Sequence, residues 1–132
     1  MATTLDLALT QGATFRRHLV WRQPQTAEQK AAGQPGTPYD LTGASAHMQV
    51  RTKVNRPSLL DLHDGAGITL GGDAGTIAIE LTSAQTMALE LKRPGVYDLF
   101  VTFSSGDVLR VVQGAVSVEL AITDPVTEVA GG

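Results

Sequence analysis

The clearest pattern in the chain is an alternation of apolar and polar residues between positions 45 and 51. One side of this segment holds Ala46, Met48 and Val50, and the other holds His47, Gln49 and Arg51. A period of two is typical of a strand with one buried and one solvated face. Asp40 and Gly43, just before it, indicate a turn. We therefore expect the fold to be organised around this strand.

Similar alternation recurs in short segments that glycine, proline, aspartate and asparagine separate. We expect further strands at residues 3–9, 14–22, 59–63, 68–70, 76–81, 96–103, 108–113 and 115–122. In the last strand, the inward positions are Val116, Val118, Leu120 and Ile122. About seven to nine short strands with tight turns predict an all-β fold, an antiparallel β-sandwich of the Ig-like or jelly-roll type.

Two segments depart from this pattern. Thr82 and Gln85 have the spacing of a capping box, which predicts one short helix near residues 82–91. Residues 23–37 are polar and contain no apolar side chain larger than alanine. Because such a segment contributes no core burial, we expect an exposed, mobile connector with a helical turn at residues 26–31.

The length and the turn spacing indicate one domain, with residues 1–122 in the sandwich and residues 123–132 as a C-terminal tail. The formal net charge of −3 gives no basic surface for nucleic acid. No apolar run approaches the ~18 residues of a membrane span, and we expect no secretory signal. With no cysteine, neither disulfides nor thiolate metal sites are available, so folding in the cytoplasm is expected.

Few residues suggest chemistry. His18, His47 and His63 lie far apart in sequence, so solvent-facing positions are expected for all three. Asp61, His63 and Asp64 form the one local group of acids and imidazole in the sequence. This group could hold a divalent ion, but a turn explains it at least as well and is the interpretation we favour.

Other motif fragments are incomplete. Ser45 lacks the second glycine of a nucleophile elbow, and Gly65, Gly67 and the pair at 71–72 lack the Gly-Lys of a phosphate loop. Arg16, Arg17 and Arg22 with Trp21 could suggest a single-strand binding surface, but we place Phe15 and Trp21 in the core. We therefore predict no catalytic residue, no cofactor and no metal.

Taken in order, several short motifs resemble a family of small structural proteins encoded in the morphogenesis region of tailed bacteriophages. The shared features are Leu5-Asp6-Leu7, Gln11-Gly12-x-Thr14-Phe15, Trp21, Tyr39-Asp40-Leu41-Thr42-Gly43, Met48-Gln49-Val50-Arg51, Gly75-Thr76-Ile77, Tyr97-Asp98-Leu99 and Gly114-x-Val116-x-Val118. The resemblance implies a virion component of the tail, fibre, baseplate or head, made in the cytoplasm of the bacterial host, and implies no active site. Residues 23–37 are a departure that could serve as a contact arm.

The favoured hypothesis is thus a non-enzymatic virion protein that contacts other virion proteins in many copies, as a homo-oligomer or a symmetric array. A carbohydrate- or receptor-binding sandwich is the alternative, and a small hydrolase is a third possibility. Glycan-binding sandwiches usually expose several aromatic rings, whereas aromatic residues make up 5% of this chain. We expect residues 1–9 and 123–132 to carry the attachment, because termini can reach a neighbour without disturbing the core.

Overall fold

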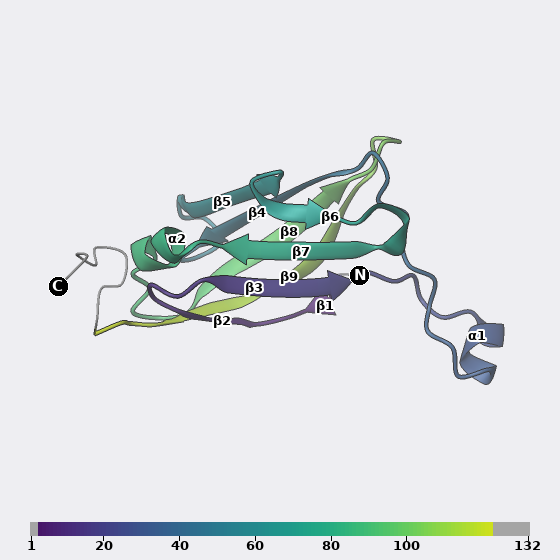
Figure 1. Ribbon diagram of the computed structural model, residues 1–132, viewed down its shortest axis with the longest axis horizontal. Helices are drawn as coiled ribbons and strands as arrows, with labels where there is room; N and C mark the ends of the chain where they lie inside the picture. The colour runs from purple at the N-terminus through teal and green to yellow at the C-terminus, as the bar shows by residue number, and fades with distance from the viewer. Residues whose placement is uncertain (1–2, 123–132) are drawn as a thin grey trace, which may run out of the picture.

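The computed structural model describes residues 3–122, which form nine strands, two α-helices and one 3-10 helix (Figure 1). In chain order the elements are β1 (Thr3–Thr4), β2 (Leu7–Thr10), β3 (Phe15–Val20), α1 (Ala27–Ala31), β4 (Ser45–Arg51), β5 (Ser58–Asp64), β6 (Gly67–Leu70), η1 (Gly72–Ala74), β7 (Thr76–Leu81), α2 (Ser83–Ala88), β8 (Gly95–Thr102) and β9 (Val108–Glu119). The predicted tail, residues 123–132, lies outside the described residues.

The strands form one curled sheet in the order β1-β9-β8-β4-β5-β6-β7-β3, and β2 also pairs with β9. The curl produces two layers: β1 and β2 with β9, β8, β4 and β5 in the larger layer, and β6, β7 and β3 in the smaller layer (Figure 1). This arrangement matches an immunoglobulin-type sandwich, in which a G-F-C-C′ sheet faces a sheet that contains strands B, E and D. The prediction of an all-β sandwich is confirmed, and the Ig-like alternative describes it.

Most strand pairs of the sandwich are antiparallel, as predicted, but the sheet also contains parallel pairs that were not expected. β1 and β2 run parallel to β9, and β5 pairs with β6 in parallel over two residues. The other pairings are antiparallel. Alternation of apolar residues reports which face of a strand is buried but not the direction of its neighbour, so the sequence pattern could not reveal the parallel pairs.

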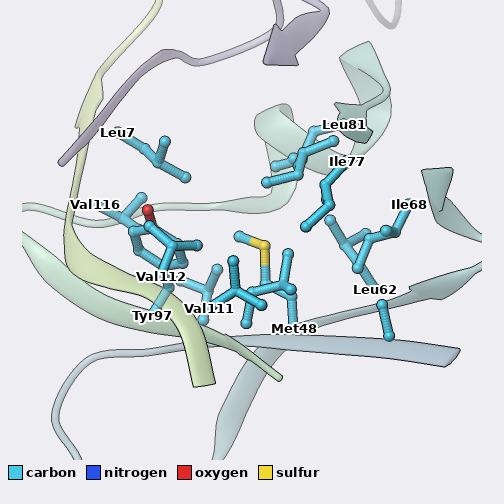
Figure 2. Close-up of a cluster of buried hydrophobic side chains, with 14 of the residues drawn as sticks. Leu7, Met48, Leu62, Ile68, Ile77, Leu81, Tyr97, Val111, Val112 and Val116 are labelled. Carbon is cyan, nitrogen blue, oxygen red and sulfur yellow. The ribbon is translucent and has the colours of Figure 1, made fainter. Parts of the chain in front are cut away.

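The core lies between the two layers (Figure 2). As predicted, the apolar face of β4 is buried, and it meets the buried face of β7 across the sandwich. Each fully buried aliphatic side chain contributes roughly 1.5–3 kcal/mol relative to an exposed one. The largest fully buried side chains are Leu41, Met48, Val50, Leu62, Ile68, Ile77, Ile79, Leu81, Leu99, Val101, Val112 and Val116.

The strand at the C-terminal side of the sheet differs from the prediction in where it begins and ends. β9 is one continuous strand where two were expected, and its register shifts opposite Leu99 and Phe100, so Val111 and Val112 are both buried. Val116 is buried, but Leu120 and Ile122 are exposed and lie beyond the end of the strand. Their predicted inward positions are wrong because alternation alone does not show where a strand outruns its neighbours.

The N-terminal segment belongs to the core. Leu7 and Leu9 are buried, and β2 pairs with β9 from Leu7 to Thr10. The Tyr97 hydroxyl donates to the Leu5 carbonyl oxygen at 2.5 Å, and the Ala115 amide donates to an Asp6 carboxylate oxygen at 2.9 Å. The expectation that residues 1–9 can leave the sandwich without disturbing the core is therefore wrong.

The helix α2 closes one end of the sandwich. The predicted capping box is present, with the Gln85 amide donating to the Thr82 hydroxyl oxygen and the Thr82 amide donating to the Gln85 side chain. The helix ends at Ala88, earlier than residue 91, because Leu89 turns to extended backbone and is itself buried. In residues 3–122, no helix has the length and apolar character needed to cross a membrane.

Candidate functional site

The most distinctive feature outside the sandwich is a projecting arm, which we define as residues 23–37, between β3 and β4 (Figure 1). The arm carries α1 at its tip, and α1 has no buried residue. Within the arm only Gly36 is buried and only Gln29 is half-buried. The predicted exposure of this segment and its helical turn are both confirmed.

The arm is held together by its own amide side chains. Thr26 and Gln29 form a capping box at the start of α1. The Gln29 side-chain amide also donates to the Thr37 hydroxyl at 3.0 Å, and Gln25 donates to the Gln34 carbonyl oxygen at 2.6 Å. These bonds join the outgoing and returning limbs, so the arm is an ordered hairpin-like projection, whereas the sequence led us to expect a mobile connector.

The base of the arm is closely packed. The Gln23 amide donates to the Thr37 carbonyl oxygen at 2.8 Å, and Arg22 pairs with Pro38 as an antiparallel bridge. A Cβ atom at Gly36 would lie 1.9 Å from the Gln23 carbonyl oxygen. The two limbs therefore approach each other so closely that only glycine fits at position 36.

Three aromatic rings anchor the base of the arm to the sandwich. Trp21 stacks on Tyr39 with ring centroids 4.0 Å apart, and Phe103 lies 5.8 Å from Trp21. All three rings are half-buried and pack against the core from its edge. The prediction that Trp21 belongs in the core holds in part, because the ring is half-buried and packs against the core cluster.

The second candidate surface is the solvent-facing side of β5, β4, β8 and β9, which we call the outer face. Strand register places side chains in rows across it. One row contains His63, His47, Phe100 and Arg110, and the next contains Asp61, Gln49, Asp98 and Gln113. The outer face thus carries charges of both signs, with Phe100 as its exposed aromatic ring, at 38% exposure.

Asp61 is the centre of a hydrogen-bond network on this face. It accepts from the Gln49 amide at 2.5 Å and from the Ser58 hydroxyl at 3.1 Å, and it lies 3.2 Å from His47 Nε2. Arg51 extends the network by donating to the Gln49 side-chain oxygen at 2.6 Å. The hydrogen bond from Gln49, and next that from His47, lower the pKa of Asp61, so its carboxylate is charged at neutral pH.

The residues considered for an ion site do not converge. Asp61 and His63 lie within β5, as the strand predicted at residues 59–63 requires, so the turn that we favoured as the explanation of their cluster is wrong. The Asp64 carboxylate accepts from the Ala46 amide at 2.9 Å, away from the network of Asp61. Among residues 3–122, no group of three or more acidic, histidine or cysteine side chains is arranged to hold a metal.

Sequence reasoning missed one pairing of histidines. His47 and His63 are opposite each other on β4 and β5, and their rings stack with centroids 4.3 Å apart. Both are exposed as predicted, as is His18, which lies on β3 in the smaller layer. The signal that could have found the pair was the register of the two strands, which depends on the length of the intervening turn.

The remaining candidates have structural roles. Ser45 is the first residue of β4, as predicted. Gly65 and Gly67 have positive φ angles on either side of the turn into β6. Arg16 forms an ion pair with Glu80 at 2.6 Å, whereas Arg22 donates to the Gly36 carbonyl oxygen in the arm. Arg16 and Arg22 therefore serve separate local contacts.

The outer face is hollowed over β8. The hollow has a volume of about 540 Å³ and is open to solvent. It is lined mainly by Gln49, Arg51, Val96, Asp98, Phe100, Arg110 and Gln113. Val96 and Phe100 on β8 are apolar members of this lining, beside charged and amide side chains. Such a surface suits a ligand or partner segment with both apolar and charged groups.

A scan against protein-family models and a search of curated proteins both give no match. Among solved structures, the chain is similar to a chicken TCR, with a TM-score of 0.47 and 14% sequence identity. The similarity covers 92% of this chain and 55% of that chain, so this protein spans about half the length of the TCR chain. The likeness concerns the fold alone.

Proposed function

We propose that this protein is a non-enzymatic structural component of a tailed-phage virion. It acts by protein–protein contacts in multiple copies, at the tail, a fibre or baseplate attachment, or the head surface. The single observation that carries the proposal is the arm: it is an ordered projection that contributes almost nothing to the core.

The energetic argument concerns the cost of ordering the arm. Fixing the backbone of one residue costs roughly 1–2 kcal/mol in conformational entropy, and core burial normally offsets that cost. The arm has no such burial, and its order comes from hydrogen bonds and the aromatic anchor at its base. An ordered, exposed segment is already organised for a partner and loses little entropy on binding. This is the property expected of a contact element.

The motifs behind the phage resemblance also support a scaffold role. Tyr97 holds Leu5 by its hydroxyl group, and Gly114 lies so close to Leu5 that a Cβ atom would be 2.2 Å from the Leu5 carbonyl oxygen. Asp40 accepts from the Thr42 amide in the turn before β4. The shared residues thus build the sandwich and the turn after the arm, as they would in a family that shares a scaffold.

The ionisable groups favour binding over catalysis. Hydrogen bonds lower the pKa of Asp40 and Asp61, and burial raises the pKa of Tyr97 to about 12. These three groups are therefore shifted away from the neutral range in which a general acid or base is most efficient. The carbohydrate-binding alternative would need several aromatic rings on one exposed surface. The hollow contains Phe100, whereas Trp21, Tyr39 and Phe103 stack on one another at the base of the arm.

The proposal can be tested with a variant that lacks the arm. Because Arg22 and Pro38 already pair antiparallel, residues 23–37 can be replaced by the two-residue turn Asn-Gly. Mass spectrometry of purified particles measures whether the native chain is present and whether the shortened chain is incorporated. We expect the native chain in many copies and the shortened chain at less than about a tenth of that level, a loss of about 1.4 kcal/mol or more in binding.

The matched control is Ser105→Asn, which changes the exposed turn between β8 and β9 without touching the arm. It should be incorporated at the native level. If the native chain is absent from particles, or if the shortened chain folds and is incorporated as well as the control, the proposed function is wrong.

A further inference from the structure

We propose that the free edge of β3 is a strand-binding site and that residues 126–130 of the same chain occupy it, as a further strand parallel to β3. The inference goes beyond the proposed function, because it concerns one end of the sheet and not the arm. It also gives the segment after Ile122 a place on the sandwich.

The strand β3 is the last strand of the smaller layer (Figure 1). Within residues 3–122 it pairs with β7 alone, so its other edge is free. The Trp21 amide, just after β3, donates to the Gly75 carbonyl oxygen on the β7 side at 2.8 Å. Because backbone groups alternate sides along a strand, the N–H and C=O groups of Arg16, His18 and Val20 are directed to the free edge. These three residues form a row of donors and acceptors that another strand can pair with.

An apolar pocket of about 140 Å³ lies beside this edge, where β3 faces β1 and β9. Its members are mostly aliphatic, and Val20 is 44% exposed. An added strand on β3 would place side chains next to this pocket and remove some of its apolar surface from water. The pocket is lined by Thr3, Leu5, Leu19, Val20, Trp21, Val111 and Val112.

The described chain ends close to the start of β3. The Ala121 amide donates to the Gln11 side-chain oxygen at 3.0 Å, and Ile122 borders the turn between β2 and β3. β3 begins at Phe15, directly after this turn. Residues 123–125 can span roughly 10 Å, and their Asp-Pro pair favours a change of direction. The next residues can therefore run along β3 from its first residue onward.

The sequence of the segment fits the edge in the register that places Thr127 beside Arg17. Neighbouring residues of paired strands share a face, so Thr127 presents a hydroxyl group to the Arg17 side chain. Two residues on, Val129 lies beside Leu19 at the rim of the apolar pocket. Pro125 comes before the strand, where its missing N–H costs least.

The occupant is assigned to the same chain and not to another copy because the connection is short. A segment tethered three residues from its site has a high effective concentration there, which a separate molecule has to exceed. A charged side chain such as Arg17 on the inward face of an edge strand also discourages apolar strands of other proteins. Residues 123–132 contain two acids and no base, so no like charge opposes their approach to Arg17.

Amide hydrogen exchange of the full chain, measured by NMR, tests the pairing at the amides of Arg16, His18 and Val20. Val129→Pro removes an N–H that would donate to β3, so these three amides should exchange about tenfold faster or more. Ala130→Pro is the matched control, because the N–H of residue 130 would face away from β3. It should leave the three exchange rates within about twofold of the wild type. Melting temperatures should show that both variants are folded.

The inference is overturned if the three amides exchange equally fast in the wild type and in Val129→Pro, or if Ala130→Pro exchanges as fast as Val129→Pro. A mixing experiment tests the assignment to the same chain. Isotope-labelled Val129→Pro is combined with an excess of unlabelled wild type, and its three amides should stay unprotected. Protection in this mixture would mean that a second copy supplies the strand, which contradicts the assignment. Incorporation of the arm-shortened chain into particles tests the proposed function separately.

Discussion

The N-terminal segment and the arm both look peripheral in the sequence, but they differ in what they contribute to the fold. Residues 3–10 bury Leu7 and Leu9 and pair along β9. The arm is longer and internally hydrogen bonded, but it buries no large side chain. The comparison separates two uses of an ordered segment: the first stabilises the sandwich, and the second projects a surface.

The largest effect on stability is expected at the N-terminal strand. Leu7→Ala leaves a cavity next to Tyr97 and Val116 in the core, and such substitutions cost roughly 2–5 kcal/mol. Urea denaturation of the variant measures this loss. An unchanged midpoint would mean that the segment is as dispensable as the arm.

Trp21→Ala should have the next largest effect, at about 1–3 kcal/mol. The ring is half-buried, so the loss is smaller than for a fully buried tryptophan, but the stack on Tyr39 is lost as well. Thermal unfolding gives the stability, and Trp21→Phe serves as the control that keeps a ring. A loss as large as that of Leu7→Ala would place Trp21 in the core instead of at the edge.

Tyr97→Phe should cost about 1 kcal/mol, because it removes the hydrogen bond to Leu5. Burial, and next the charge of Asp6, raise the pKa of Tyr97 to about 12 from its ordinary value of 10. The folded state thus holds this proton more tightly than the unfolded state. The stabilisation of the fold by protonated Tyr97 is complete below pH 10 and is lost as the pH rises to about 12. Melting temperatures between pH 9 and 12 should therefore fall more steeply for the wild type than for Tyr97→Phe, and parallel curves would rule out this linkage.

Asp61→Asn should have a small effect with the opposite pH dependence. The hydrogen bonds from Gln49 and His47 lower the pKa of Asp61 below its ordinary value of 3.8. The stabilisation is present above that value and is lost as the pH falls below it. The difference in melting temperature between wild type and variant should shrink as the pH is lowered from 7 to 3. A difference that grows toward acidic pH would contradict the network on the outer face.

The sequence predicted the parts of the fold that depend on local pattern. Alternation located β4 and β7, and the spacing of Thr82 and Gln85 located α2, because burial period and helix capping involve residues close in the chain. The parallel pairing of β2 with β9 was not predictable in this way. It depends on contacts between the two ends of the described chain.

The candidate site was predicted only in part. The polar composition of residues 23–37 indicated exposure, but the order of the arm depends on Gly36 and on the side chain of Gln25 reaching across to Gln34. The rows of the outer face, including the stack of His47 on His63, follow from strand register, which no local motif specifies. These features could not be predicted without knowing which segments pair with each other in the folded chain.

The central claim is that the arm serves contact and not stability. The variant in which Asn-Gly replaces residues 23–37 tests it most directly, by comparing its unfolding free energy and its incorporation into particles with those of Ser105→Asn. The account predicts a stability within about 0.5 kcal/mol of the control, because no core burial is lost, together with a loss of incorporation. An arm-shortened protein that is destabilised by several kcal/mol, or that enters particles at the level of the control, would contradict the claim.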